Sequence, residues 1–273
     1  MLALLKKIFA WYLNASLHVA LATSALVQIT FYFSNIPFDL LITVFIFCGT
    51  SASYNIIKYL PYVAIHRQYK SSLKGIVLLT LVFLIVCTVL FCYLNFKTQL
   101  ATILFAVLSI MYVIPFSKSL PNLRNLAGIK IYIVSVCWAG VTLLLPVLNA
   151  NMQLDIDIAY KFMQRFVLTL ILILIFEIRD IKNDESQLKT VPQLIGIKNT
   201  KRAIYCLLPI FYGLEFLKEG FYQNQYYINL LLCILIAIAT KYVHANRSKY
   251  YTYFWVESLP IVWYALILMC SKF

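Results

Sequence analysis

The chain has 273 residues, of which 63% are hydrophobic and 12% are charged, and its formal net charge is +13. With a mean hydropathy of +0.85, it has too little polar surface to coat a water-soluble globule of this size. These values exclude most classes of soluble protein and indicate a chain whose solvent is a lipid bilayer.

The apolar residues fall in separate blocks of about 17 to 25 residues, the length of helix that crosses ~30 Å of hydrocarbon. Strands of a membrane barrel would show alternating segments of ~10 residues, and the stretch 167–175 shows no such alternation. We therefore predict an all-α, polytopic membrane protein of about nine transmembrane helices in one domain, 1–273. The predicted spans are 12–34, 38–57, 75–94, 98–115, 129–149, 160–179, 202–219, 226–243 and 252–271.

The positive charge is one-sided. Lys and Arg gather at the N-terminus and in every second loop, as expected of cytoplasmic loops. The exceptions are Lys97, Lys161, Arg165, Lys218 and Lys272. This predicts a cytoplasmic N-terminus and a C-terminus on the opposite side. Because topology accounts for the charge, we expect no nucleic-acid partner; the expected partners are the bilayer itself, anionic lipid head groups or a diphosphate.

Carboxylates are concentrated at the cytoplasmic end of the sixth predicted span, which carries four of the ten acidic residues. On a helix, Glu177, Asp180 and Asp184 follow i, i+3, i+7 spacing and share one face. Hard cations such as Mg²⁺ take oxygen ligands from one or two carboxylates and from substrate phosphates. The spacing therefore fits a Mg²⁺ site, and the alternative is a solvated helix end balanced by neighbouring Lys and Arg.

The sequence RDIKNDESQLKTVPQLIG, residues 179–196, resembles the second aspartate motif of the UbiA superfamily of intramembrane prenyltransferases. The matching positions are Asp180 and Asp184 for the aspartate pair, Thr190 and Pro192 for the T-x-P sequence, and Gly196 for the glycine that follows. The stretch 112–118 after the fourth span also agrees with the family, and the resemblance covers essentially the whole chain.

The resemblance implies a UbiA-like ring of helices around a central cavity. An isoprenoid diphosphate would bind there with Mg²⁺, and the prenyl group would pass to an acceptor that the sequence does not identify. Asp180 and Asp184 would be metal ligands and catalytic residues, and Lys118 would neutralise the leaving diphosphate. The candidate substrate-binding residues are Asn55, Lys58, Tyr112, Arg124, Lys130 and Glu177.

The first aspartate motif of the family, N-D-x-x-D-x-x-x-D, is degenerate in this chain. The corresponding sequence is SYNIIKYLPY, in which only Asn55 remains, and no Asp or Glu lies between Asp39 and Asp155. We therefore expect weak dependence on Mg²⁺. Lys58 follows Asn55 closely, and its ammonium would either lie near phosphate oxygens or pair with Asp180 or Asp184.

These departures leave other functions open. The first alternative is a catalytically inactive UbiA-fold protein that binds lipid or isoprenoid, or serves as a membrane assembly factor. A secondary transporter would need ionisable groups within its spans and helices broken by Gly or Pro. Glu257 and Pro260 in the last span are weak evidence for such a transporter.

Overall fold

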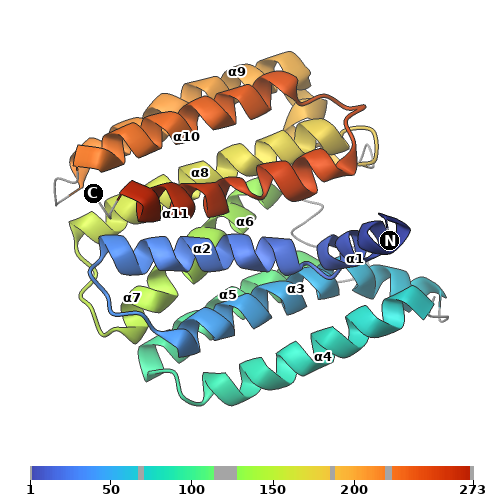
Figure 1. The fold of residues 1–273 in the computed structure, drawn as a ribbon, viewed down its shortest axis with the longest axis horizontal. Coiled ribbons are helices and arrows are strands. Elements are labelled where there is room, and N and C mark those ends of the chain that lie inside the picture. Colours follow the sequence, from blue (N-terminus) through green and yellow to red (C-terminus); the bar gives the residue numbers. More distant parts are fainter. Residues whose placement is uncertain (1, 67–70, 114–127, 185–187, 219–222, 271–273) are drawn as a thin grey trace.

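The computed structural model of the protein describes residues 2–66, 71–113, 128–184, 188–218 and 223–270. In these ranges the regular structure is entirely helical, and the helices lie side by side along the long axis of the molecule (Figure 1). The helices are α1 (Leu2–Asn14), α2 (Leu17–Phe33), α3 (Leu40–His66), α4 (Ser71–Phe91), α5 (Phe96–Val113), α6 (Ile129–Ala139), α7 (Leu145–Asn149), α8 (Ile156–Asp180), α9 (Val191–Gly213), α10 (Gln223–Tyr242) and α11 (Leu259–Cys270). Short π-helical segments, η2 (Gly140–Leu144) and η5 (Tyr251–Val256), precede α7 and α11, and a 3₁₀ segment, η4 (Leu214–Leu217), follows α9.

The all-α membrane fold agrees with the prediction, but the count of nine spans is not confirmed. Among the described residues, six helical stretches are long and apolar enough to cross a bilayer. They are 40–60, 73–91, 129–149, 156–180, 224–242 and 251–270. The pair α1 and α2 makes a seventh if it is one span bent by 58°.

Two helix boundaries differ from the predicted spans for local reasons. The first predicted span, 12–34, is broken at Ser16, whose φ of 57° lies in the left-handed region. The predicted loop before residue 202 contains the start of α9, because Pro192 in the first turn is compatible with a helix start. Gly196 then has φ 80° and ψ 155°, which bends α9 shortly after it begins.

Helix α8 forms the centre of the bundle and α4 forms part of its surface. Of the spanning residues, 61% are buried in α8 and 11% in α4. The α8 side chains Ile171, Ile175 and Ile178 are completely buried, and they belong to one core with Phe211 of α9 and Trp263 of α11. Because α8 packs against α6, α9 and η5, its last turn holds a defined position.

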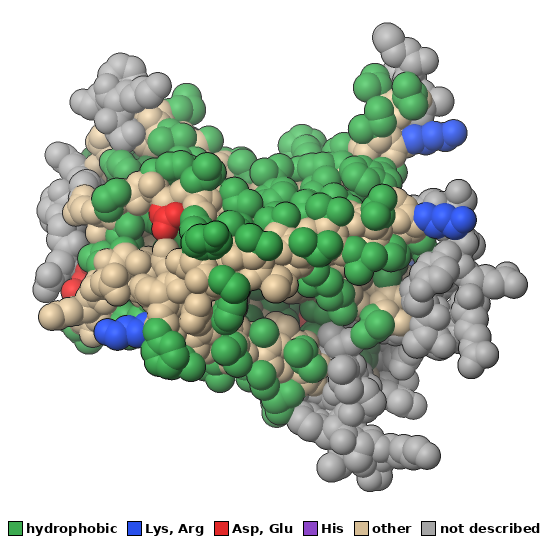
Figure 2. Space-filling model, turned by 90° about the horizontal axis from the view of Figure 1, so that it is seen from below, with side chains coloured by type: hydrophobic (Ala, Val, Ile, Leu, Met, Phe, Trp, Pro, Cys, Tyr) green, Lys and Arg blue, Asp and Glu red, His purple; other side chains and the backbone are tan. Residues whose placement is uncertain are grey.

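The surface of the bundle suits a hydrocarbon environment. Leu78, Leu81, Ile85 and Val89 of α4 are all more than 45% exposed. Figure 2 shows hydrophobic side chains across the middle of this face, with Lys and Arg towards its ends. An exposed apolar band of this kind is what a membrane-embedded helix bundle presents to lipid. The chain is therefore an integral, multi-pass membrane protein.

The two termini lie at opposite ends of the bundle (Figure 1). The N-terminus shares its end with the last turn of α8, which carries Asp180, and with the connection between α10 and η5. This arrangement is compatible with the predicted orientation, in which the N-terminus and the carboxylates lie on the cytoplasmic side.

Candidate functional site

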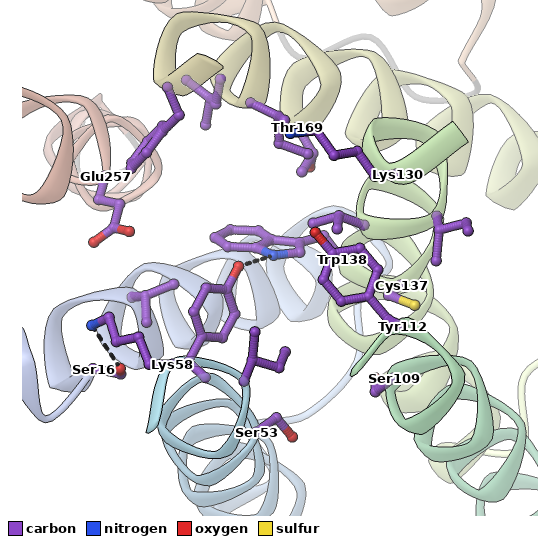
Figure 3. Close-up of a pocket in the computed structure, with 18 of the residues that line it drawn as sticks. Ser16, Ser53, Lys58, Ser109, Tyr112, Lys130, Cys137, Trp138, Thr169 and Glu257 are labelled. Carbon is purple, nitrogen blue, oxygen red and sulfur yellow. Dashed lines mark hydrogen bonds between the residues drawn. The ribbon is translucent and has the colours of Figure 1, made fainter. Parts of the chain in front are cut away.

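A chamber of about 470 Å³ opens between helices that are distant in sequence. Its walls come from α2, α3, α5, α6, α8 and the segment that joins η5 to α11, and Figure 3 shows several of these helices surrounding it. Much of the lining is apolar. The charged side chains that line it are Lys58, Lys130, Asp180, Asp184 and Glu257. An apolar chamber with a few charged groups has the make-up of a ligand-binding site.

The two aspartates of the predicted motif lie together at this chamber. Asp180 is the last residue of α8, and the N–H of Asp184 donates to the Asp180 carbonyl at 3.0 Å. This bond continues the helical turn beyond the end of α8. Asp180, Asp184 and Glu177 also line an adjoining recess of about 160 Å³. The three carboxylates thus face the same space, as the i, i+3, i+7 spacing predicts.

Glu177 joins three helices rather than standing free in the chamber. Its carboxylate forms an ion pair with Lys130 of α6 at 2.9 Å, and its Oε2 accepts the N–H of Val191 at the start of α9 at 3.0 Å. The Glu177 side chain is only 5% exposed and that of Lys130 13%. Both were predicted to bind substrate. The structure pairs their charges with each other, although Lys130 still lines the chamber.

The connection between α8 and α9 holds the backbone at Asp184. The side chain of Gln193 accepts the N–H of Thr190 at 2.9 Å and donates to the Asp184 carbonyl at 3.3 Å. Gln193 thereby caps the start of α9 and ties it to the loop that carries the aspartate. Part of the matched motif therefore has a structural role, which is to orient Asp184.

Lys58 points into the chamber without reaching the aspartates. Its Nζ donates to Ser16 Oγ at 3.3 Å and to the Leu13 carbonyl at 3.4 Å (Figure 3). In the described part of the chain no ion pair joins Lys58 to Asp180 or Asp184, and Asp180 binds Arg179 instead. Of the two positions predicted for Lys58, the pairing with these aspartates is wrong.

Of the four remaining predicted site residues, the structure describes two. Tyr112 lines the chamber (Figure 3). Asn55 lies on α3, its Nδ2 donates to Thr80 Oγ1 of α4 at 3.0 Å, and it is 2% exposed. Its side chain thus contacts α4, and the chamber lining described above does not include it. Lys118 and Arg124 lie outside the described residues.

Two residues of the site, Tyr253 and Glu257, are not among the predicted site residues. The Tyr253 ring stacks on Phe176 at 5.9 Å, with the Arg179 guanidinium 5.5 Å and the Lys58 ammonium 5.7 Å from its centroid. Glu257 projects into the chamber from the wall near Lys58 (Figure 3). From the sequence alone, Tyr253 fits an interfacial aromatic belt. The i, i+4 spacing of Tyr253 and Glu257 is the sequence signal that places them on one face.

The acidic residues fit a metal ion that arrives with a phosphate ligand. Among the described residues there is no cluster of three or more His, Cys, Asp or Glu side chains that could hold a metal ion. Asp180 and Asp184 supply two carboxylates at the chamber wall. Mg²⁺ is commonly held by one or two carboxylates together with substrate phosphates and water, so this pair suits such a shared site.

Helices enclosing an apolar chamber with two aspartates at one end define a class of membrane protein: the chain has the fold of the UbiA homologues. The structure of a UbiA homologue from Archaeoglobus fulgidus bound to GPP and Mg²⁺ matches it with a TM-score of 0.63 and 14% identity, over 96% of this chain and 99% of that one. A UbiA homologue from Aeropyrum pernix K1 also gives 0.63, with 15% identity over 95% and 98% of the two chains.

A structure described for digeranylgeranylglyceryl phosphate synthase matches with a TM-score of 0.59 and 15% identity, over 97% of this chain and 96% of that one. No protein-family model matches the sequence, and neither does any curated protein. At these identities the likeness establishes the shared fold.

Proposed function

We propose that this protein is a membrane prenyltransferase that transfers an isoprenoid from a polyprenyl diphosphate to an acceptor. The observation that carries the proposal is the position of Asp180 and Asp184, which share an apolar chamber with Lys58 and Lys130. Solved structures of the same fold include a homologue bound to GPP and Mg²⁺ and one bound to DMAPP and Mg²⁺. The acceptor is left open.

The diphosphate group would occupy the charged end of the chamber. Asp180 and Asp184 would hold Mg²⁺ together with phosphate oxygens, and this ion would stabilise negative charge on the departing diphosphate. The isoprenoid chain would lie along apolar residues such as Leu108, Ile133 and Leu172. Burial of its methyl and methylene groups would contribute to affinity at about 25 cal/mol per Å².

The chain's own residues would protect the reacting carbon. As the bond between C1 of the prenyl group and the diphosphate oxygen breaks, positive charge develops on the allylic carbon. Trp138 and Tyr54 line the chamber, and the Trp138 Nε1 donates to the Tyr54 hydroxyl at 2.8 Å (Figure 3). Aromatic faces attract a cation, and apolar walls exclude water that would intercept it.

The test compares matched substitutions in protein purified into phosphatidylcholine nanodiscs. Geranyl diphosphate binding is measured by isothermal titration calorimetry with Mg²⁺ and with EDTA. We expect Mg²⁺ to tighten binding in the wild type. Asp180→Asn and Asp184→Asn should lose about 10- to 100-fold of that enhancement, as expected when a metal site loses a supporting group.

Asp39→Asn is the matched control, because it removes a carboxylate just before α3, which begins at the opposite end of the bundle from the last turn of α8 (Figure 1). There Asp39 accepts from the Ile42 N–H and from Asn149 Nδ2, and asparagine retains an acceptor for the former. It should keep the full Mg²⁺ enhancement. A wild type that does not bind geranyl diphosphate, or aspartate variants that keep the enhancement, would overturn the proposal.

The second candidate is an inactive UbiA-fold protein that binds lipid or isoprenoid, or serves in membrane assembly. It is favoured by the make-up of the acidic site, since the described residues offer no cluster of three potential metal ligands. The two functions differ in turnover. Release of inorganic diphosphate that depends on the enzyme and on Asp180 supports the transferase, whereas Mg²⁺-dependent binding without any release supports the inactive protein.

A further inference from the structure

The carboxylates of the aspartate pair and the ammonium group of Lys58 lie on different walls of the chamber. The end of α8 contributes Asp180 and the turn after it contributes Asp184, whereas α3 contributes Lys58. Helix α3 carries no Asp or Glu at all. A Mg²⁺ ion held by α8 would therefore find no carboxylate on α3, and the charged group that this helix presents to a ligand is a cation.

Lys58 differs from the other cations near the chamber in its partners. Lys130 is paired with Glu177, and Arg179 is paired with Asp180. Lys58 donates instead to two neutral oxygens, one of Ser16 and one of Leu13. Among the described residues it forms no ion pair within 4.0 Å. Its ammonium is therefore not neutralised by a contacting carboxylate.

Tyr253 connects Lys58 with the end of α8. The Lys58 ammonium and the Arg179 guanidinium each lie within 6 Å of its ring centroid. Cation–π attraction to this ring holds the Lys58 ammonium near the end of α8 without neutralising it, whereas Arg179 is already paired with Asp180. Lys58 thus lies beside the part of the chamber in which the proposed function places the diphosphate.

We propose that Lys58 binds phosphate oxygens of the isoprenoid diphosphate directly, so that part of the binding persists without Mg²⁺. This inference rests on the proposed function and assigns a second, metal-free component to the same site. A lysine ammonium binds phosphate as a compact point charge. The aspartates would then govern the Mg²⁺-dependent component, and Lys58 the component that remains in EDTA.

The experiment measures geranyl diphosphate binding in EDTA in phosphatidylcholine nanodiscs. Relative to wild type, we expect Lys58→Gln to weaken metal-free binding about tenfold or more, the effect of losing a charge-assisted hydrogen bond. Lys58→Arg should retain it within about threefold, because the positive charge is kept. Lys74→Gln, an exposed cation on α4 that does not line the chamber, should leave it unchanged.

The Mg²⁺ enhancement retained by Lys58→Gln shows that this variant is folded. Binding by wild type in Mg²⁺ but not in EDTA, or unchanged metal-free binding by Lys58→Gln, would overturn the inference and leave the proposed function intact. No binding under either condition would overturn both. If phosphatidic acid in the nanodisc bound as tightly as geranyl diphosphate with the same dependence on Lys58, the site would belong to a lipid head group and the assignment would be wrong.

Discussion

At the scale of single residues, Glu177 shows how one carboxylate near a site can serve the fold. It pairs with Lys130 and also accepts the Val191 N–H, so α6, α8 and α9 meet at one side chain. Both charged groups of the pair are largely buried. Removing one partner of a buried pair leaves the other charge without compensation, which costs more than the pair itself contributes.

Glu177→Gln should therefore lower stability by roughly 3 kcal/mol, because glutamine still accepts the Val191 N–H but leaves Lys130 uncompensated. The measurement is thermal unfolding in nanodiscs, followed by tryptophan fluorescence. The double variant Glu177→Gln, Lys130→Met should recover much of the loss, since no unpaired charge remains. A double variant less stable than Glu177→Gln would contradict this explanation.

Some residues of the candidate site could be predicted from the sequence, and others could not. Asp180 and Asp184 are predicted as a pair because their spacing is local and their neighbours match a known motif. Tyr253 and Glu257 lie at least 69 residues away along the chain, and no local pattern connects them with the aspartates. They join the site because η5 and α11 pack beside α2 and α8, which is a tertiary contact.

At the scale of elements, the start of α9 depends on backbone geometry that a short motif encodes. Pro192 occupies the first turn, Gln193 ties Thr190 to Asp184, and Gly196 bends the helix. Gly196 has φ 80° and ψ 155°, a region that is nearly confined to glycine. The glycine of the motif is thus explained by conformation, because a Cβ there would meet no atom within 4 Å.

Gly196→Ala should destabilise the protein by about 1 to 3 kcal/mol through backbone strain alone. Gly213→Ala is the matched control: a Cβ added there would also meet no atom within 4 Å, but its φ of −64° and ψ of −33° are helical. It should be neutral or stabilising by roughly 0.5 to 1 kcal/mol. The measurement is the thermal unfolding midpoint of each variant. Equal midpoints would rule out the conformational explanation of Gly196.

At the scale of the whole molecule, the bundle is asymmetric from end to end. The acidic motif and the N-terminus share one end, and the C-terminus lies at the other (Figure 1). The distribution of Lys and Arg predicts that the first of these ends faces the cytoplasm. A cytoplasmic position would give the chamber access to diphosphates and Mg²⁺ from that compartment.

This orientation can be tested by cysteine labelling in intact cells, in a background without the seven native cysteines. Met152→Cys lies between α7 and α8, and Ser248→Cys lies between α10 and η5; both positions are exposed. An impermeant maleimide should label residue 152 without permeabilisation and residue 248 only after it. The reverse pattern would invert the predicted topology.

The properties that depend on local composition and spacing can be predicted from the sequence. These are the membrane environment, the helical class and the aspartate pair, because hydropathy and i, i+4 spacing act over short stretches of chain. Which charges share the chamber depends instead on how helices that are distant in sequence pack together. Lys58, Asp180 and Glu257 come from three separate segments of the chain. Whether Lys58 pairs with an aspartate or faces a ligand depends on distances that packing alone sets.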